Sequence, residues 1–131
     1  MPSFSKKSLS HLSTCHDDLQ DLFKEVVVHF DCTVLAGYRN KEEQETAFRN
    51  GMTQLRFPHG KHNKSPSLAA DVIPYPIDWK DRERLHYFAG FVKGVANGLD
   101  IDIRWGGDWD SDTEVRDNSF DDLVHFELRQ G

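Results

Sequence analysis

A single carboxylate interrupts an apolar stretch near the middle of this sequence. The run from Leu68 to Ile73 is otherwise apolar and ends at Pro74, a pattern typical of a short buried strand. A bare carboxylate inside such a strand costs several kcal/mol unless a partner compensates it. Asp71 therefore requires a basic partner, a bound metal ion or an exposed strand face, and the fold must supply one of these three.

Helices and strands are predicted in mixed order around this run. Apolar residues at helical spacing predict helices over about residues 15–30, 40–51 and 78–99, with Asn40 and Glu43 forming a capping box and Asp78 a candidate cap. Short apolar or alternating runs predict strands over residues 32–36, 68–73, 101–105 and 123–128. Residues 51–68 are predicted to form a long loop. The pattern indicates an α+β fold with about three helices and a small, largely antiparallel sheet.

Composition narrows the class of protein further. The 131 residues carry a formal charge of −6, and an acidic chain without a basic stripe argues against nucleic-acid binding. No run approaches the ~20 apolar residues of a membrane span, and the N-terminus lacks the apolar segment of a secretory signal. Cys15 and Cys32 fit no disulfide framework and are interpreted as packing residues. We expect a monomeric single domain over residues 1–131 that is made in a cytoplasm.

Two of the seven histidines stand at positions that suit metal binding. His62 precedes Asp71 by nine residues, and His125 shares one face of the last predicted strand with Glu127. A hydrolytic zinc site needs three nitrogen or oxygen ligands and an open fourth position, and His62, Asp71 and His125 supply three. His59 lies in the same loop as His62 and is the alternative first ligand.

Metal-assisted hydrolysis also needs a base and a group that stabilises the developing oxyanion. Asp122 lies three residues before His125, near enough to approach the same ion without binding it. Arg39 follows the predicted strand over residues 32–36 and is the candidate for stabilising the oxyanion. The alternative is that it pairs with a carboxylate.

The ordered combination of these motifs resembles a known family. The motifs are Gly37-Tyr-Arg39, Gln44, Gly51, Lys61-His62, Ala70-Asp71, Trp79, Trp105-Gly-Gly-Asp-Trp109 and Asp122-x-x-His125-x-Glu127. Over residues 19–128 the sequence is similar to zinc peptidases of the D-alanyl-D-alanine carboxypeptidase clan, and within the clan most similar to phage L-alanyl-D-glutamate endopeptidases.

The resemblance implies a hedgehog/D,D-peptidase-like fold and specific residue roles. It implies that His62, Asp71 and His125 are the zinc ligands. It also implies that Asp122 is the catalytic carboxylate and that Arg39 stabilises the polarised carbonyl. Three further residues become candidates for substrate contacts or for orienting a ligand: Gln44, Trp109 and Glu127.

The spacing between the first two ligands departs from the family pattern. The family advances seven residues from His to Asp with a Gly between them, whereas here the advance from His62 to Asp71 is nine and no Gly intervenes. His59 therefore stays open as the first ligand, although Lys61 before His62 matches the Ser-Lys-His pattern of the family.

The resemblance also implies a substrate and a place of action. It implies a phage or prophage endolysin that hydrolyses the L-alanyl-D-glutamate amide of peptidoglycan stem peptides, without a separate wall-binding domain. Such a protein accumulates in the host bacterial cytoplasm and reaches the wall when a holin opens the inner membrane. Four cations are candidates for attracting the substrate's carboxylates: Arg49, Arg56, Lys61 and Lys64.

Two other functions stay open at this point. One is a D-alanyl-D-alanine carboxypeptidase of the same clan. The other is a non-catalytic zinc-containing domain that binds the wall or belongs to the phage structure.

A second group of acids has the spacing of a cation loop. Asp108, Asp110 and Asp112 repeat at positions one, three and five of a calcium loop, but position six is Thr113 rather than Gly. The segment is therefore not an EF-hand. A looser regulatory cation site, with calcium as the candidate ion, is the hypothesis.

Overall fold

The computed structural model describes residues 2–116 and 120–129. Its elements are α1 (Lys6–Leu12), α2 (Asp17–His29), β1 (Cys32–Ala36), α3 (Lys41–Arg49), the 3-10 turn η1 (Lys61–Asn63), β2 (Ala69–Pro74), α4 (Arg82–Gly98), β3 (Ile103–Gly106) and β4 (Asp122–Leu128). The α+β class and the four strands are confirmed. Helix α1 is not among the predicted helices, because its seven residues bury only Ser8 and Leu12 and carry no clear apolar period.

The strands form one antiparallel sheet in the order β1-β2-β4-β3. The last strand in the sequence therefore lies between β2 and β3 in the sheet. Its register places His125 opposite Asp71 on β2, and Glu127 opposite Arg104 on β3. Directly opposed residues in antiparallel strands place their side chains on the same face, so these four polar side chains share one face of the sheet.

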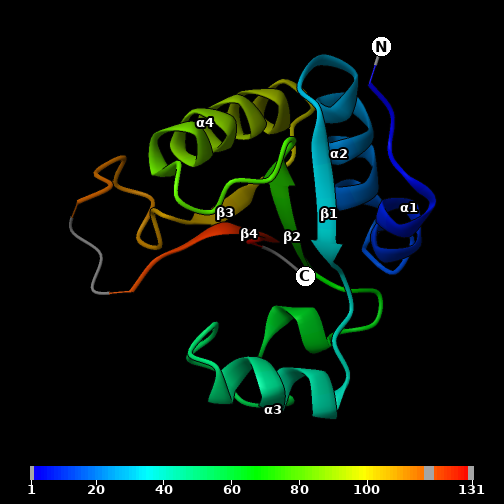
Figure 1. Cartoon of the computed structure of the whole chain (residues 1–131), viewed down its shortest axis with the longest axis vertical. Coiled ribbons are helices and arrows are strands. Elements are labelled where there is room, and N and C mark those ends of the chain that lie inside the picture. Colours follow the sequence, from blue (N-terminus) through cyan, green and yellow to red (C-terminus); the bar gives the residue numbers. More distant parts are fainter. Residues whose placement is uncertain (1, 117–119, 130–131) are drawn as a thin grey trace.

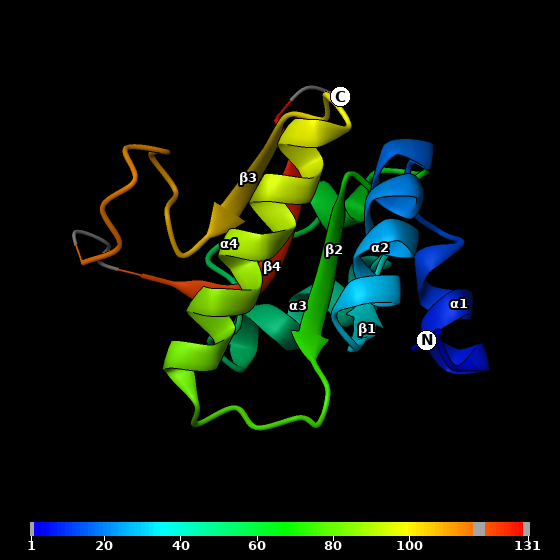
Figure 2. The same ribbon diagram turned by 90° about the horizontal axis from the view of Figure 1, so that it is seen from above.

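The other face of the sheet carries the hydrophobic core. Phe126 on β4 makes edge-to-face contacts with Phe23 on α2 and Phe88 on α4, at centroid distances of 5.5 and 6.1 Å. Figure 1 shows α4 on one side of the sheet and α3 on the other, and Figure 2 shows α2 beside α4 from above. Alternation along β4 thus separates the apolar face from the polar face, as the sequence predicts.

The helix starts agree with the sequence at α3 and differ from it at α4. The capping box is confirmed, since Asn40 accepts from the backbone N–H of Glu43 and Glu43 accepts from that of Asn40. Asp78 is not the cap of α4: it accepts from the backbone of Lys80 in the preceding turn, and Asp81 caps the helix.

Among the described residues, no helix combines the length and apolarity needed to cross a membrane.

Candidate active site

Three buried side chains converge on the polar face of the sheet. His62, Asp71 and His125 each offer one ligand atom, and these atoms lie within 4.8 Å of one another. Oδ1 of Asp71 lies 3.1 Å from Nε2 of His62 and 3.4 Å from Nδ1 of His125. Their side chains are 3%, 6% and 11% exposed, in sequence order. His59 is exposed and lies outside this cluster, so the geometry favours His62 over His59 as the first ligand.

Strand pairing and one loop contact bring the cluster together. Asp71 and His125 are directly opposite on β2 and β4. His62 comes from η1, and its backbone carbonyl accepts from the N–H of Arg39 at 2.8 Å. The segment after β1 thereby holds the long loop against the sheet.

Each histidine has its second ring nitrogen engaged. Nδ1 of His62 donates to the carbonyl of Gly37 at 2.6 Å, and Nε2 of His125 donates to Oε1 of Glu127 at 2.8 Å. These partners leave Nε2 of His62 and Nδ1 of His125 turned toward Asp71. Metal-binding histidines are usually oriented in this way, so the donor set fits a divalent metal ion.

The charges around the cluster favour a cation at its centre. Burial by itself lowers the pKa of His125, but its hydrogen bonds to Asp71 and Glu127 raise that pKa to about 9. Burial raises the pKa of Asp71, but the two histidines outweigh it and hold that pKa well below its ordinary range. Burial lowers the pKa of His62. An environment that stabilises a protonated imidazole beside a carboxylate also suits a metal cation.

Glu127 is a buried partner of His125 rather than a solvent-facing residue. It is 4% exposed. Burial opposes its ionisation, but His125, Arg104 and Lys61 lower its pKa to about 2. Glu127 is therefore ionised and holds His125 in one orientation.

Arg39 is anchored to the cluster. Its Nη2 donates to Oδ2 of Asp71 at 2.5 Å, so the two oxygens of Asp71 have different partners. Its Nη1 donates to Gln44 at 3.4 Å, and buried Gln44 donates in turn to the carbonyl of Leu55 at 2.7 Å. A basic partner is one of the three possibilities for Asp71, and carboxylate pairing is the alternative for Arg39; the structure shows this pair. It leaves Oδ1 turned toward the two histidines.

Asp122 stands at the edge of the cluster, at the first residue of β4. The register of β3 and β4 shifts beside it, where Gly106 pairs with Asp122. Burial and the nearby charge of Asp71 raise the pKa of Asp122 to about 6. A carboxylate with a raised pKa in a cleft is a candidate for proton transfer.

Two cavities meet at Asp122. One of about 210 Å³ is lined by His62, His125 and Trp109, and the other of about 370 Å³ is lined by Asp71, Met52 and Trp79. Both are lined by Arg39, Phe120 and Asp122 as well. The shared residues make the two cavities neighbours, and we refer to them as the smaller and the larger arm of a groove.

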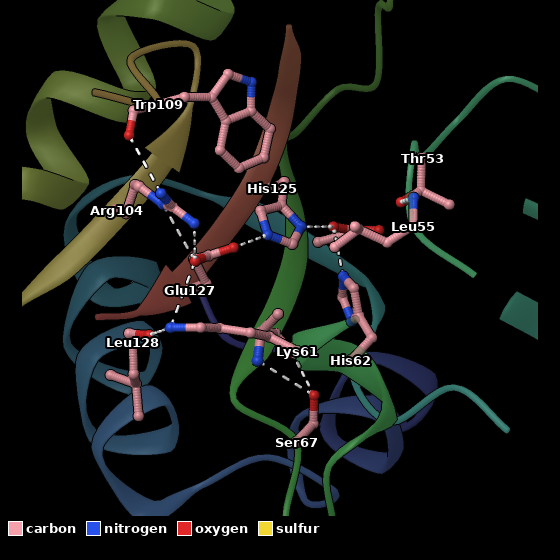
Figure 3. Close-up of polar contacts among 12 residues, drawn as sticks. Thr53, Leu55, Lys61, His62, Ser67, Arg104, Trp109, His125, Glu127 and Leu128 are labelled. Atoms are coloured by element: carbon pink, nitrogen blue, oxygen red, sulfur yellow. Dashed lines mark hydrogen bonds and ion pairs between the residues drawn. The ribbon is translucent and has the colours of Figure 1, made fainter. Parts of the chain in front are cut away.

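The two tryptophans of the β3 end have different surroundings. Trp105 is buried and donates from its indole N–H to the carbonyl of Leu123 at 2.8 Å, which makes it a core residue. Trp109 lies with its ring 5.5 Å from that of His125 and donates to the carbonyl of Phe120 at 2.8 Å. Trp109 therefore forms one wall of the groove, and Figure 3 shows its ring beside His125.

The acids of the loop after β3 form a second cluster. Asp108, Asp110 and Asp112 each offer an oxygen within 4.8 Å of the others. Asp108 is buried, and its two oxygens accept from the backbone N–H groups of Asp112 and Thr113 at 3.2 and 3.0 Å. These bonds give Asp108 a role in shaping the loop, and calcium binding stays a prediction.

The cations that line the groove differ in part from the four predicted. Lys61 lines the smaller arm, together with Arg104, which is not among those four. Arg56 instead donates from two nitrogens to Oε2 of Glu45, at 3.0 and 2.8 Å. The alternation of the strand over residues 101–105 could have identified Arg104, because Ile103 and Trp105 point into the core.

The fold has a clear counterpart among solved structures. The crystal structure of Serratia marcescens L-Ala D-Glu endopeptidase ChiX superimposes with a TM-score of 0.72, covering 97% of this chain and 90% of that one. The two sequences are 22% identical, so the likeness establishes a shared fold. No curated protein matches the sequence.

The sequence itself identifies the family. The family model of phage L-alanyl-D-glutamate peptidases matches residues 2–129. The chain therefore belongs to the phage L-alanyl-D-glutamate peptidase family. This confirms the resemblance seen in the sequence and the prediction of a peptidoglycan endopeptidase of the endolysin type.

Proposed function

We propose that the chain is a zinc-dependent endolysin that hydrolyses the L-alanyl-D-glutamate amide of stem peptides with its own His62, Asp71, His125 and Asp122. One observation carries the proposal: three buried ligand atoms lie within 4.8 Å of one another beside a carboxylate whose pKa is raised to about 6. The donor set of two imidazoles and one carboxylate is typical of catalytic zinc sites.

The ligand atoms would be Nε2 of His62, Oδ1 of Asp71 and Nδ1 of His125. When bound there, zinc would act as a Lewis acid that acidifies water and polarises the scissile carbonyl. Gly37 and Glu127 hold the two imidazoles through their outer nitrogens, which aims the ligand nitrogens at one point, and a bound zinc ion would take the place of the proton on Nδ1 of His125.

Asp122 would move the proton. As a base it takes a proton from the attacking water, and as an acid it delivers that proton to the amine of D-glutamate when the amide bond breaks. Arg39 lines both arms of the groove while bound to Asp71, so its guanidinium lies where it can stabilise negative charge on the carbonyl oxygen.

We also propose where the protein acts. The substrate lies outside the inner membrane, and we infer that the protein accumulates in the host bacterial cytoplasm, as a monomer, and reaches the wall at lysis. Fractionation of infected or expressing cells before and after membrane permeabilisation tests this, and wall cleavage in intact cells would contradict it.

Product analysis with metal removal tests the activity. Purified peptidoglycan is incubated with the protein before and after chelation, and again after zinc is restored, while bound metal is measured in parallel. We expect new N-terminal D-glutamate only in the metal-loaded samples. Release of free D-alanine would identify a carboxypeptidase instead, and absence of any cleavage by zinc-loaded protein would favour a non-catalytic wall-binding domain.

A further inference from the structure

The two arms of the groove differ in charge. The smaller arm is lined by Lys61 and Arg104, and a further cavity of about 150 Å³ beyond it is lined by the same two cations with Glu127 and Arg129. The larger arm carries Glu43 and Asp121. Asp121 is paired with Arg82 at 2.6 Å, and Arg39 lines both arms. The arms therefore differ mainly in the two cations of the smaller arm and in Glu43 of the larger one.

Lys61 and Arg104 in the smaller arm pair with the same carboxylate, whereas Arg39 pairs with Asp71. Arg104 donates to Oε2 of Glu127 from Nε and Nη2 at 3.2 and 2.9 Å, and Nζ of Lys61 lies 3.4 Å from the same oxygen. Figure 3 shows the two side chains reaching Glu127 from different directions. One carboxylate cannot neutralise two cations, so one positive charge stays uncompensated on this wall.

These cations are accessible to a ligand. The side chain of Arg104 is 39% exposed and that of Lys61 is 28% exposed, whereas Glu127 between them is 5% exposed. The guanidinium also lies over the ring of Trp109, with 5.4 Å between Cζ and the ring centroid. The stacked ring and the two bonds to Oε2 of Glu127 fix the direction of Arg104, and a planar guanidinium in a fixed direction favours recognition of a planar anion.

The substrate carries such an anion close to the bond that is cut. In a stem peptide the D-glutamate continues the chain through its side-chain carboxyl, so its α-carboxylate is free and is attached to the carbon next to the scissile nitrogen. We propose that Lys61 and Arg104 bind this α-carboxylate, which places the D-glutamate side of the substrate in the smaller arm and the L-alanine side in the larger arm. The inference rests on the proposed function, because it assigns the orientation of that substrate.

The opposite orientation is disfavoured by charge. It would bring the α-carboxylate toward Glu43, whose like charge repels it, and away from Lys61 and Arg104. Asp121 adds little to this repulsion because it is paired with Arg82 at 2.6 Å. The larger arm instead offers apolar side chains, among them Leu35, Met52 and Val124, which suit the methyl group of L-alanine.

Peptides that differ at one group test the orientation. Two synthetic stem peptides are compared, one with D-glutamate and one with its α-amide, which keeps the shape and removes the charge. We expect the native protein to cleave the acid with a kcat/KM roughly ten- to a hundredfold above that of the amide, as for one charge-assisted hydrogen-bonded contact. Arg104→Gln and Lys61→Met should each reduce this ratio, and the double variant should bring it near one, mainly through slower cleavage of the acid.

A matched variant and a second readout separate recognition from structure. Arg56→Gln removes an arginine that makes the same two-nitrogen contact with a glutamate but lines neither arm, so its ratio should equal that of the native protein. Because Arg104 also touches Glu127, bound zinc is measured in every variant. The orientation would be overturned if the variants lost kcat/KM equally on both peptides, or if the native acid-to-amide ratio of kcat/KM were near one. Either result would leave the peptidase activity itself intact. If native protein released N-terminal D-glutamate from neither peptide nor peptidoglycan, the proposed function itself would fail.

Discussion

Nε2 of His125 donates to Oε1 of Glu127 at 2.8 Å, and this bond turns Nδ1 of the same ring toward Asp71. Replacing Glu127 should therefore weaken metal binding without removing a ligand. Partners of this kind contribute roughly 10- to 100-fold in metal affinity. We expect Glu127→Leu to raise the zinc Kd toward the upper end of that range.

Glu127→Gln provides the graded comparison. It keeps the size of the side chain and one acceptor oxygen, so its loss of affinity should be smaller than that of Glu127→Leu. Competition with a zinc indicator measures both, and the exposed Glu83 on α4, changed to Leu, is the control. A zinc Kd that is the same in all four proteins would contradict an orienting role for Glu127.

Replacing Asp122 and replacing His125 should have different effects on zinc binding and on turnover. Asp122→Asn keeps the three ligand atoms, so it should bind zinc normally and lose roughly 10²- to 10⁴-fold in kcat. His125→Ala removes one ligand atom and should lose zinc as well as activity. Metal analysis of the purified variants separates the two effects, and equal loss of zinc in both would refute the division of roles.

The acid side of the pH profile should report Asp122. Its pKa is raised to about 6 by burial and by Asp71, while His125 and Arg39 oppose the rise. A base must be ionised to accept a proton, so activity should fall as the pH drops through this value. A bound cation favours the ionised form and lowers the pKa, so the midpoint in zinc-loaded protein should lie at or below about pH 6.

The measurement is kcat/KM against pH, with zinc content determined at each point. Loss of zinc at acid pH would mark protonation of the ligands instead. A midpoint above pH 7 at full zinc occupancy would show that another group controls the profile.

The elements that the sequence predicts best are those with a local signal. The alternation over residues 123–128 places His125 and Glu127 opposite the apolar face, and Asn40 with Glu43 forms a capping box whose two bonds are both present. The position of Asp71 inside an apolar run already required a compensating partner. These features depend on neighbours in the chain, and the chain order is enough to find them.

The features that escaped prediction depend on the sheet order. Carboxylate pairing of Arg39 was an open alternative, but its match with Asp71 was not predicted, because it arises from the position of β1 next to β2. Arg104 reaches Glu127 because β3 pairs with β4, and the register places these two residues opposite each other. Local patterns do not specify which strands are neighbours, so sequence reasoning found the residue types of the site but not all of its contacts.

Gly106 should be intolerant of a side chain. A Cβ at this position would lie 2.1 Å from the backbone carbonyl oxygen of Asp122, where β3 and β4 meet. Gly106→Ala must therefore push the strands apart at Asp122, at about 1–3 kcal/mol of stability. We expect lower activity with zinc binding largely retained, because the ligands lie elsewhere on the strands.

A glycine with open space where a Cβ would lie provides the control for this substitution. A Cβ added to Gly94 on α4 would meet no other atom within 4 Å, so Gly94→Ala should stabilise the protein by about 0.4–1 kcal/mol. Chemical denaturation measures both free energies of unfolding. A Gly106→Ala protein as stable and as active as the native one would show that β3 and β4 separate at little cost.

The two cysteines should be protected in the folded protein. Both are free and buried, and burial raises the pKa of each thiol to about 12, with Asp71 adding to the effect at Cys15 and Asp31 at Cys32. The thiolate is the reactive form, so at pH 8 each should react with a disulfide reagent about a thousandfold more slowly than a thiol of ordinary pKa. Guanidinium should expose both to rapid reaction. Reaction of either thiol at the rate of an unfolded peptide, in protein that circular dichroism shows to be folded, would contradict their interpretation as packing residues.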